Sequence, residues 1–112
     1  MKKIFSTLLV AIIATLLLTA CVSDFEKGQK MHEDAYDQAF EIIAFVANNP
    51  EQINEDLKRT ATQDINNIYE NLLRELNSLN LSASEKERLL SAYDYSFADS
   101  LEQLSFAFEQ NN

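Results

Sequence analysis

The chain has few of the residues on which small catalytic and metal-binding domains depend. Its 112 residues include one Gly, one Pro, one Cys, one His and no Trp. A single glycine leaves no room for a glycine-rich loop that cradles phosphates. A single cysteine excludes a disulfide framework and a cysteine-based zinc cluster. The length allows one domain at most, because a chain this short cannot bury two cores.

Basic residues are also scarce, with 9 Lys and Arg against 18 Asp and Glu and a formal net charge of −9. A protein that binds the phosphate backbone needs the opposite sign of charge, so we expect no nucleic acid partner. The apolar content of 46% is too high for a disordered chain. These proportions indicate one acidic, folded domain.

The longest apolar run lies at the start of the chain. Lys2 and Lys3 precede residues 4–18, which are apolar except for two threonines and a serine. A positive start, an apolar run of about 7–15 residues and small residues after it are typical of a secretory signal peptide. The run is marginal for a membrane-spanning helix, which needs roughly 20 apolar residues.

The end of this run, Leu18-Thr19-Ala20-Cys21, resembles the lipobox of bacterial lipoprotein precursors. The resemblance implies that a signal peptidase recognises the three residues before Cys21 and cuts there, after the cysteine sulfur has received a diacylglyceryl group. Acyl chains such as palmitate then anchor the protein, each buried CH₂ contributing about 0.8 kcal/mol. Val22 stands where an aspartate would favour the inner membrane, so the resemblance implies the outer membrane, facing the periplasm.

The resemblance divides the chain into a signal peptide (residues 1–20), a lipidated tether (21–28) and a domain (29–112). Cleavage leaves seven basic and 18 acidic residues, a formal charge of −11 once the terminal amine is acylated. Anionic lipid headgroups should repel a domain with this charge, and a basic patch on a partner should attract it. The only glycine, Gly28, is expected to be a hinge between tether and domain.

Apolar residues recur at spacings of three and four through the rest of the chain. They predict three amphipathic helices at about residues 29–48, 50–78 and 83–108. No segment alternates at period two, so strands are not expected. The expected fold is all-α, a small three-helix bundle; the alternative is a helical hairpin that dimerises through the same apolar stripes.

Two boundaries carry recognisable caps. Asn49 and Pro50 are expected to end the first helix and begin the second, with Asn49 as its N-cap. Ser82 and Glu85 form a capping box before the third. Residues 42–47 are all apolar, so we expect the end of the first helix to be buried on more than one side.

Residues for catalysis or metal binding are sparse. His32 is the only histidine, and Tyr36 stands where a helical zinc motif needs its second histidine, so we expect an exposed His32 and no metal site. No serine has a glycine-rich elbow beside it. The carboxylates of Glu33, Asp37 and Glu41 share one helix face, which we interpret as a solvated face. We therefore expect a non-enzymatic protein without a cofactor.

One pair of aromatic residues departs from the pattern of the third helix. At 100° per residue, Tyr95 and Phe106 lie about 20° apart and opposite the main apolar stripe, on the face that carries Arg88, Asp99 and Glu102. Bulky aromatic residues on a polar face can mark a binding site. Tyr95, Phe106, Asp99 and Glu102 are therefore a candidate surface for a protein partner or for self-association, unless another helix covers them.

The function expected from the sequence is that of a lipid-anchored bacterial envelope protein that binds a protein partner. Its size, acidity and expected location in the envelope suit an accessory subunit, an immunity or exclusion protein, or an inhibitor. The alternative is a helical module that encloses a small apolar ligand, lined by Phe40, Phe45, Tyr69 and Phe97. The lipobox resemblance covers residues 1–21 only.

Overall fold

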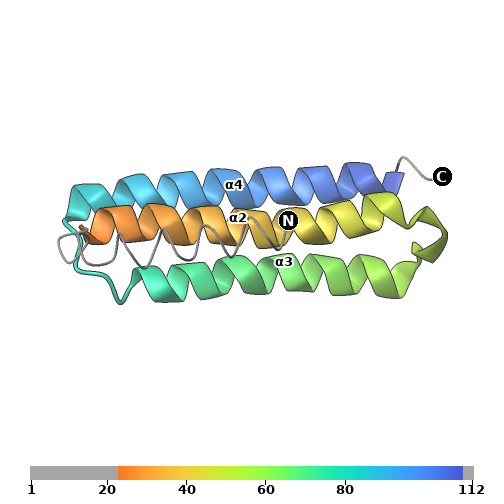
Figure 1. Cartoon of the computed structure of the whole chain (residues 1–112), viewed down its shortest axis with the longest axis horizontal. Coiled ribbons are helices and arrows are strands. Elements are labelled where there is room, and N and C mark those ends of the chain that lie inside the picture. The colour runs from red at the N-terminus through yellow and green to blue at the C-terminus, as the bar shows by residue number, and fades with distance from the viewer. Residues whose placement is uncertain (1–22, 110–112) are drawn as a thin grey trace, which may run out of the picture.

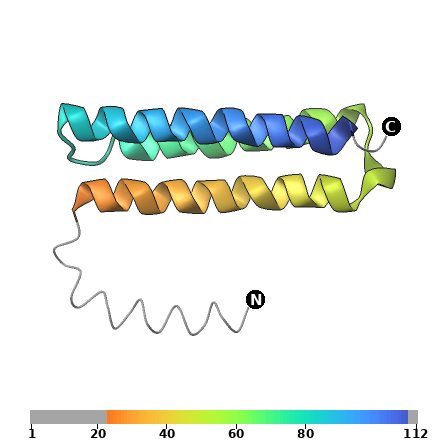
Figure 2. The same ribbon diagram turned by 90° about the horizontal axis from the view of Figure 1, so that it is seen from above.

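A computed structural model describes residues 23–109, which form three long helices (Figure 1). They are α2 (Asp24–Asn48), α3 (Glu55–Leu76) and α4 (Ala83–Glu109), with one 3-10 turn, η1 (Pro50–Gln52), between the first two. The chain runs up, down and up, so α2 and α4 are parallel and α3 is antiparallel to both (Figures 1 and 2). The predicted all-α three-helix bundle is confirmed, and the described part of the chain contains no strand.

The first helix begins earlier than predicted, at Asp24 rather than at residue 29. Ser23 is the N-cap, and its hydroxyl accepts a hydrogen bond from the backbone N–H of Glu26 at 3.2 Å. Asp24 and Glu26 place two carboxylates in the first turn, where the helix dipole favours negative charge. Residues 24–28, which the sequence placed before the first helix, therefore belong to α2.

Gly28 is a point of close helix packing, and its prediction as a hinge is wrong. The residue is buried within α2, where an added Cβ would lie 2.5 Å from Leu89 Cδ1 and 3.4 Å from Tyr93 Oη. The Tyr93 hydroxyl donates a hydrogen bond to the Gly28 carbonyl oxygen at 2.7 Å. The missing side chain thus allows α4 to approach the backbone of α2.

The second helix begins later than predicted, because Pro50 opens η1 and not α3. Asn49 makes no side-chain cap bond to this turn, and its amide donates instead to the Phe45 carbonyl oxygen at 2.8 Å. The N-cap of α3 is Asn54, whose side-chain oxygen accepts from the Leu57 backbone N–H at 2.8 Å. The prediction of Asn49 as N-cap is wrong, since η1 turns the chain before the next helix starts.

The start of α4 is capped as predicted. The Ser82 hydroxyl accepts from the Glu85 N–H at 3.1 Å, and the Glu85 carboxylate accepts from the Ser82 N–H at 3.0 Å. The loop before it is tied to the first helix, because Asp24 Oδ2 accepts from the Asn80 N–H at 2.6 Å. This contact holds the beginning of α2 against the α3–α4 loop at one end of the bundle.

The core is built from one face of each helix, as the predicted stripes require. Side chains on the three inner faces interdigitate along the whole bundle, and the most deeply buried large ones include Val46, Ile65, Leu76, Tyr93 and Leu104. Within the described residues no buried side-chain polar atom lacks a hydrogen-bond partner. Buried Ser100 lies 3.3 Å from the Tyr69 hydroxyl, which accounts for a polar side chain at this depth.

The apolar end of α2 is covered on one side only. Ile43 and Val46 are buried, whereas Phe45 is 47% exposed and Ala47 is exposed. The expectation that residues 42–47 are buried on more than one side is therefore wrong. In a three-helix bundle each helix has two neighbours, so apolar residues beyond the inner face remain partly in contact with solvent.

Candidate functional site

Among residues 23–109, five large hydrophobic side chains are exposed, and they come from all three helices: Phe40 and Phe45 of α2, Leu73 of α3, and Tyr95 and Phe106 of α4. Residues of this type at a charged surface are candidates for contact with another molecule. Because they lie on three different helices, each surface is considered separately.

The predicted surface on α4 lies on the side of that helix away from the core. Tyr95 is 77% exposed and Phe106 is 52% exposed, so neither is covered by another described helix. Glu102 is exposed, and Asp99 is half-buried and accepts a hydrogen bond from the Gln103 side-chain amide at 2.7 Å. Two bare aromatic rings and two carboxylates thus share one stretch of α4.

His32 of α2 contacts α4, so the expectation of an exposed histidine is wrong. Its Nε2 lies 2.6 Å from Ser96 Oγ, and its ring packs on Tyr93 with centroids 5.1 Å apart. Burial lowers the pKa of His32 below 6.5, and the nearby Glu33 carboxylate opposes the shift. Because α2 starts at Asp24, this residue lies beyond the first turn and reaches the helix interface.

The His32–Ser96 pair serves as an interhelical link and does not suggest a catalytic dyad. A serine nucleophile works beside hydrogen-bond donors, often backbone N–H groups next to it in the chain, that stabilise the oxyanion forming on its substrate. Ser96 lies in the interior of α4, where those groups are used by the helix itself. The pair therefore adds no catalytic candidate to those considered from the sequence.

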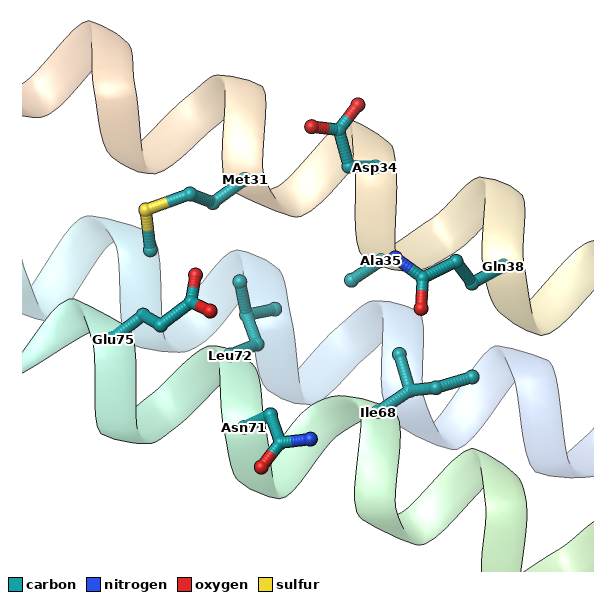
Figure 3. A pocket seen from close by; sticks show the side chains of 8 residues that line it. All are labelled: Met31, Asp34, Ala35, Gln38, Ile68, Asn71, Leu72 and Glu75. Carbon is teal, nitrogen blue, oxygen red and sulfur yellow. The ribbon is translucent and has the colours of Figure 1, made fainter.

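A hollow of about 300 Å³ opens between α2 and α3 (Figure 3). Its floor is apolar, since Ile68 and Leu72 of α3 point toward α2 and Ala35 faces them. Its rim is polar. The full lining comprises Met31, Asp34, Ala35 and Gln38 of α2 with Ile68, Asn71, Leu72 and Glu75 of α3.

A second hollow of about 300 Å³ continues the first along the same two helices. The two share Gln38, so they lie next to each other along the same pair of helices, and together they are called here the α2–α3 groove. The second part is lined by Gln38, Glu41, Ile42, Phe45 and Val46 of α2 with Leu57, Thr60, Ala61 and Asp64 of α3. From Met31 to Phe45 it runs about 21 Å at 1.5 Å per residue. No sequence pattern singled out this groove, because it depends on how far apart two helices lie.

The aromatic residues considered for a small-ligand cavity do not surround a common space. Tyr69 and Phe97 pack against each other between α3 and α4, with ring centroids 5.2 Å apart. A hollow of about 150 Å³ lies beside them. Phe40 is 52% exposed, and Phe45 belongs to the α2–α3 groove. The predicted four-residue lining is therefore not formed.

The predicted lipidation site, Cys21, and the recognition residues Leu18, Thr19 and Ala20 lie outside the described residues. Among residues 23–109, no group of three or more His, Cys, Asp or Glu side chains could hold a metal ion. In the same range, no helix has the length and hydropathy needed to cross a membrane. These findings leave the α4 surface and the α2–α3 groove as the candidate sites.

Comparison of the chain with family models, curated proteins and solved structures found no match.

Proposed function

We propose that the chain is a small acidic bacterial lipoprotein that acts without catalysis, by binding a protein partner at the membrane. The observation that carries the binding role is the exposure of Tyr95 and Phe106 beside Asp99 and Glu102 on α4. Aromatic residues of this kind supply much of the affinity at protein interfaces, where a buried anchor contributes about 2 kcal/mol or more. The surrounding carboxylates favour a partner with a basic surface.

The lipobox supports the membrane anchor. In the sequence, Val22 alone separates Cys21 from Ser23, the N-cap of α2. Acylation of Cys21 would therefore attach the lipid directly at the end of the bundle where α2 begins. The membrane would be the outer one, with the bundle facing the periplasm, as Val22 suggests.

The biological setting is that of an envelope protein that recognises another protein. An accessory subunit of an envelope complex, an immunity or exclusion protein and an inhibitor would all use an anchored, acidic binding surface. In each case the anchor confines the search for a partner to the membrane surface, and the acidic surface speeds the encounter with a basic partner.

Crosslinking in living cells, followed by capture of the full-length protein, tests this function. The wild type should capture one stoichiometric partner and incorporate radiolabelled palmitate. Cys21→Ala should incorporate no palmitate and lose the partner. The double change Tyr95→Ser with Phe106→Ser should retain palmitate and lose the partner. The lipid anchor remains in this variant, whereas the two aromatic side chains that contact the partner are gone.

Leu73→Ser is the matched control, since Leu73 is another exposed apolar residue and lies on a different helix. This variant should behave as the wild type does. Unchanged capture by the Tyr95 and Phe106 double variant would remove the basis for the α4 surface. Palmitate incorporation by Cys21→Ala would show that the anchor is elsewhere.

A further inference from the structure

We propose that the α2–α3 groove receives one basic amphipathic helix of a protein partner, which packs there as a fourth helix of the bundle. The proposal rests on the partner-binding function above and specifies the chemistry of that partner. It concerns a surface separate from the α4 face of Tyr95 and Phe106.

The shape of the groove suits a helix. Its walls are two antiparallel helices, and its length of about 21 Å corresponds to roughly four helical turns. Two helices packed side by side leave a furrow into which a third can fit its side-chain ridges, and four-helix bundles are completed in this way. A helix laid in an apolar groove is also a recurring mode of peptide recognition.

The floor of the groove offers apolar surface that the bundle itself leaves incompletely covered. Met31, Ile42, Leu57 and Ile68 pack against the core but are only partly buried. Phe45 adds a ring that is nearly half exposed at one end. A helix in the groove would remove this surface from water, gaining about 25 cal/mol for each Å² of apolar surface covered.

The charge of the rim selects a basic occupant. The groove is lined by four carboxylates, from Asp34 and Glu41 on α2 and Asp64 and Glu75 on α3, and by no Lys or Arg. Asp34 pairs with Lys30 at 3.6 Å, with both side chains more than half exposed. Such a pair is weak and exchanges easily. The other three make no ion pair with another described residue.

The same rim disfavours the other occupants that an apolar groove could hold. A second copy of the chain would bring its own acidic bundle, with a formal charge of −11 over the described residues, against these four carboxylates. A fatty acid would bring its own carboxylate close to the same four carboxylates, which would repel it. A helix with lysine or arginine on both sides of an apolar stripe meets the floor and both rims at once.

The test uses the full-length chain in a nonionic detergent and two synthetic peptides that share one leucine stripe. One peptide carries lysine on its polar face, and the other carries glutamate. A fluorophore on each peptide reports binding through anisotropy, with empty micelles subtracted. The lysine peptide should bind, more weakly as salt is added, and the glutamate peptide should not.

Substitutions locate the binding surface. Reversing two rim charges, Glu41→Lys with Asp64→Lys, should weaken lysine-peptide binding by about tenfold or more, since two attractive pairs become repulsive. The control Glu70→Lys with Glu87→Lys makes the same change in net charge at exposed positions outside the groove. It should weaken binding by less than about threefold, the effect of long-range charge alone. Phe45→Ser should weaken binding severalfold, and Leu73→Ser should not.

Equal binding of both peptides, or equal loss in the rim and control variants, would overturn the proposal of a basic helix in this groove. Displacement of an apolar dye by a fatty acid, but by neither peptide, would replace the helix with a small ligand. Capture in cells separates this proposal from the function itself. A partner retained by the rim variant but lost with the Tyr95 and Phe106 changes would leave the binding function standing and refute the groove.

Discussion

Replacing Gly28 by alanine should destabilise the bundle by about 1 kcal/mol, although the same replacement usually stabilises a helix. Alanine in a helix interior is favoured over glycine by about 1 kcal/mol. At this position, however, the new Cβ would lie 2.5 Å from Leu89 Cδ1. Leu89 is buried, so its side chain has little room to move. Overpacking of this kind costs about 1–3 kcal/mol, which exceeds the gain in propensity.

A double-mutant cycle isolates the contact. Leu89→Ala alone should cost about 2–5 kcal/mol through the cavity it leaves. In that background Gly28→Ala should stabilise by about 1 kcal/mol, because the clashing atom is gone and the helix propensity remains. The coupling between the two positions should therefore be about 2 kcal/mol.

Urea unfolding followed by far-ultraviolet circular dichroism measures each free energy. Ala98→Gly gives the propensity term by itself, since Ala98 is exposed in the interior of α4, and should cost about 1 kcal/mol. Gly28→Ala could instead stabilise the wild type as much as it stabilises the Leu89→Ala variant. That result would show that the approach of α4 does not need a glycine at position 28.

Three further changes test other parts of the fold by the same unfolding measurement. Ile65→Ala should cost about 2–5 kcal/mol, because Ile65 is fully buried; a cost below about 1 kcal/mol would contradict the core. Asn54→Ala should cost about 1 kcal/mol through loss of the α3 cap, and an unchanged midpoint would reject that cap. Burial lowers the pKa of folded His32, so its contribution to stability should be lost as pH falls below about 6.5. His32→Gln should flatten this dependence, and an unchanged slope would assign it to other groups.

The three helices were predictable because apolar spacing records which face of each helix is buried. Apolar residues at this spacing in α3, such as Ile65, Leu72 and Leu76, are buried, and the Ser82 capping box starts α4 where predicted. The first two helix starts were not predictable in the same way. Asn49 and Asn54 are both good N-caps, and only the path of η1 decides between them. Glycine destabilises helices in general, yet the close approach of the neighbouring helix requires it at position 28.

The candidate sites also differ in whether the sequence could predict them. The side of α4 that carries Tyr95 and Phe106 follows from the helical wheel alone, whereas their exposure depends on no other described helix covering that side. The α2–α3 groove depends on the spacing of two helices, and no periodicity reports it. The position of His32 in the interface depends on the true start of α2. Features that belong to one helix were accessible from the sequence, and features that belong to two were not.

Residues 23–109 form three helices, and this odd number has a mechanical consequence. The start of α2 and the end of α4 lie at opposite ends of the bundle, and the two helices run in parallel (Figure 2). A force applied between Asp24 and Glu109 therefore acts along the helix axes. It loads the contacts between α2 and α4, such as Gly28 with Tyr93 and His32 with Ser96, together in shear. A bundle held in this way yields only when many contacts fail at once, whereas one pulled from a shared end would unzip contact by contact.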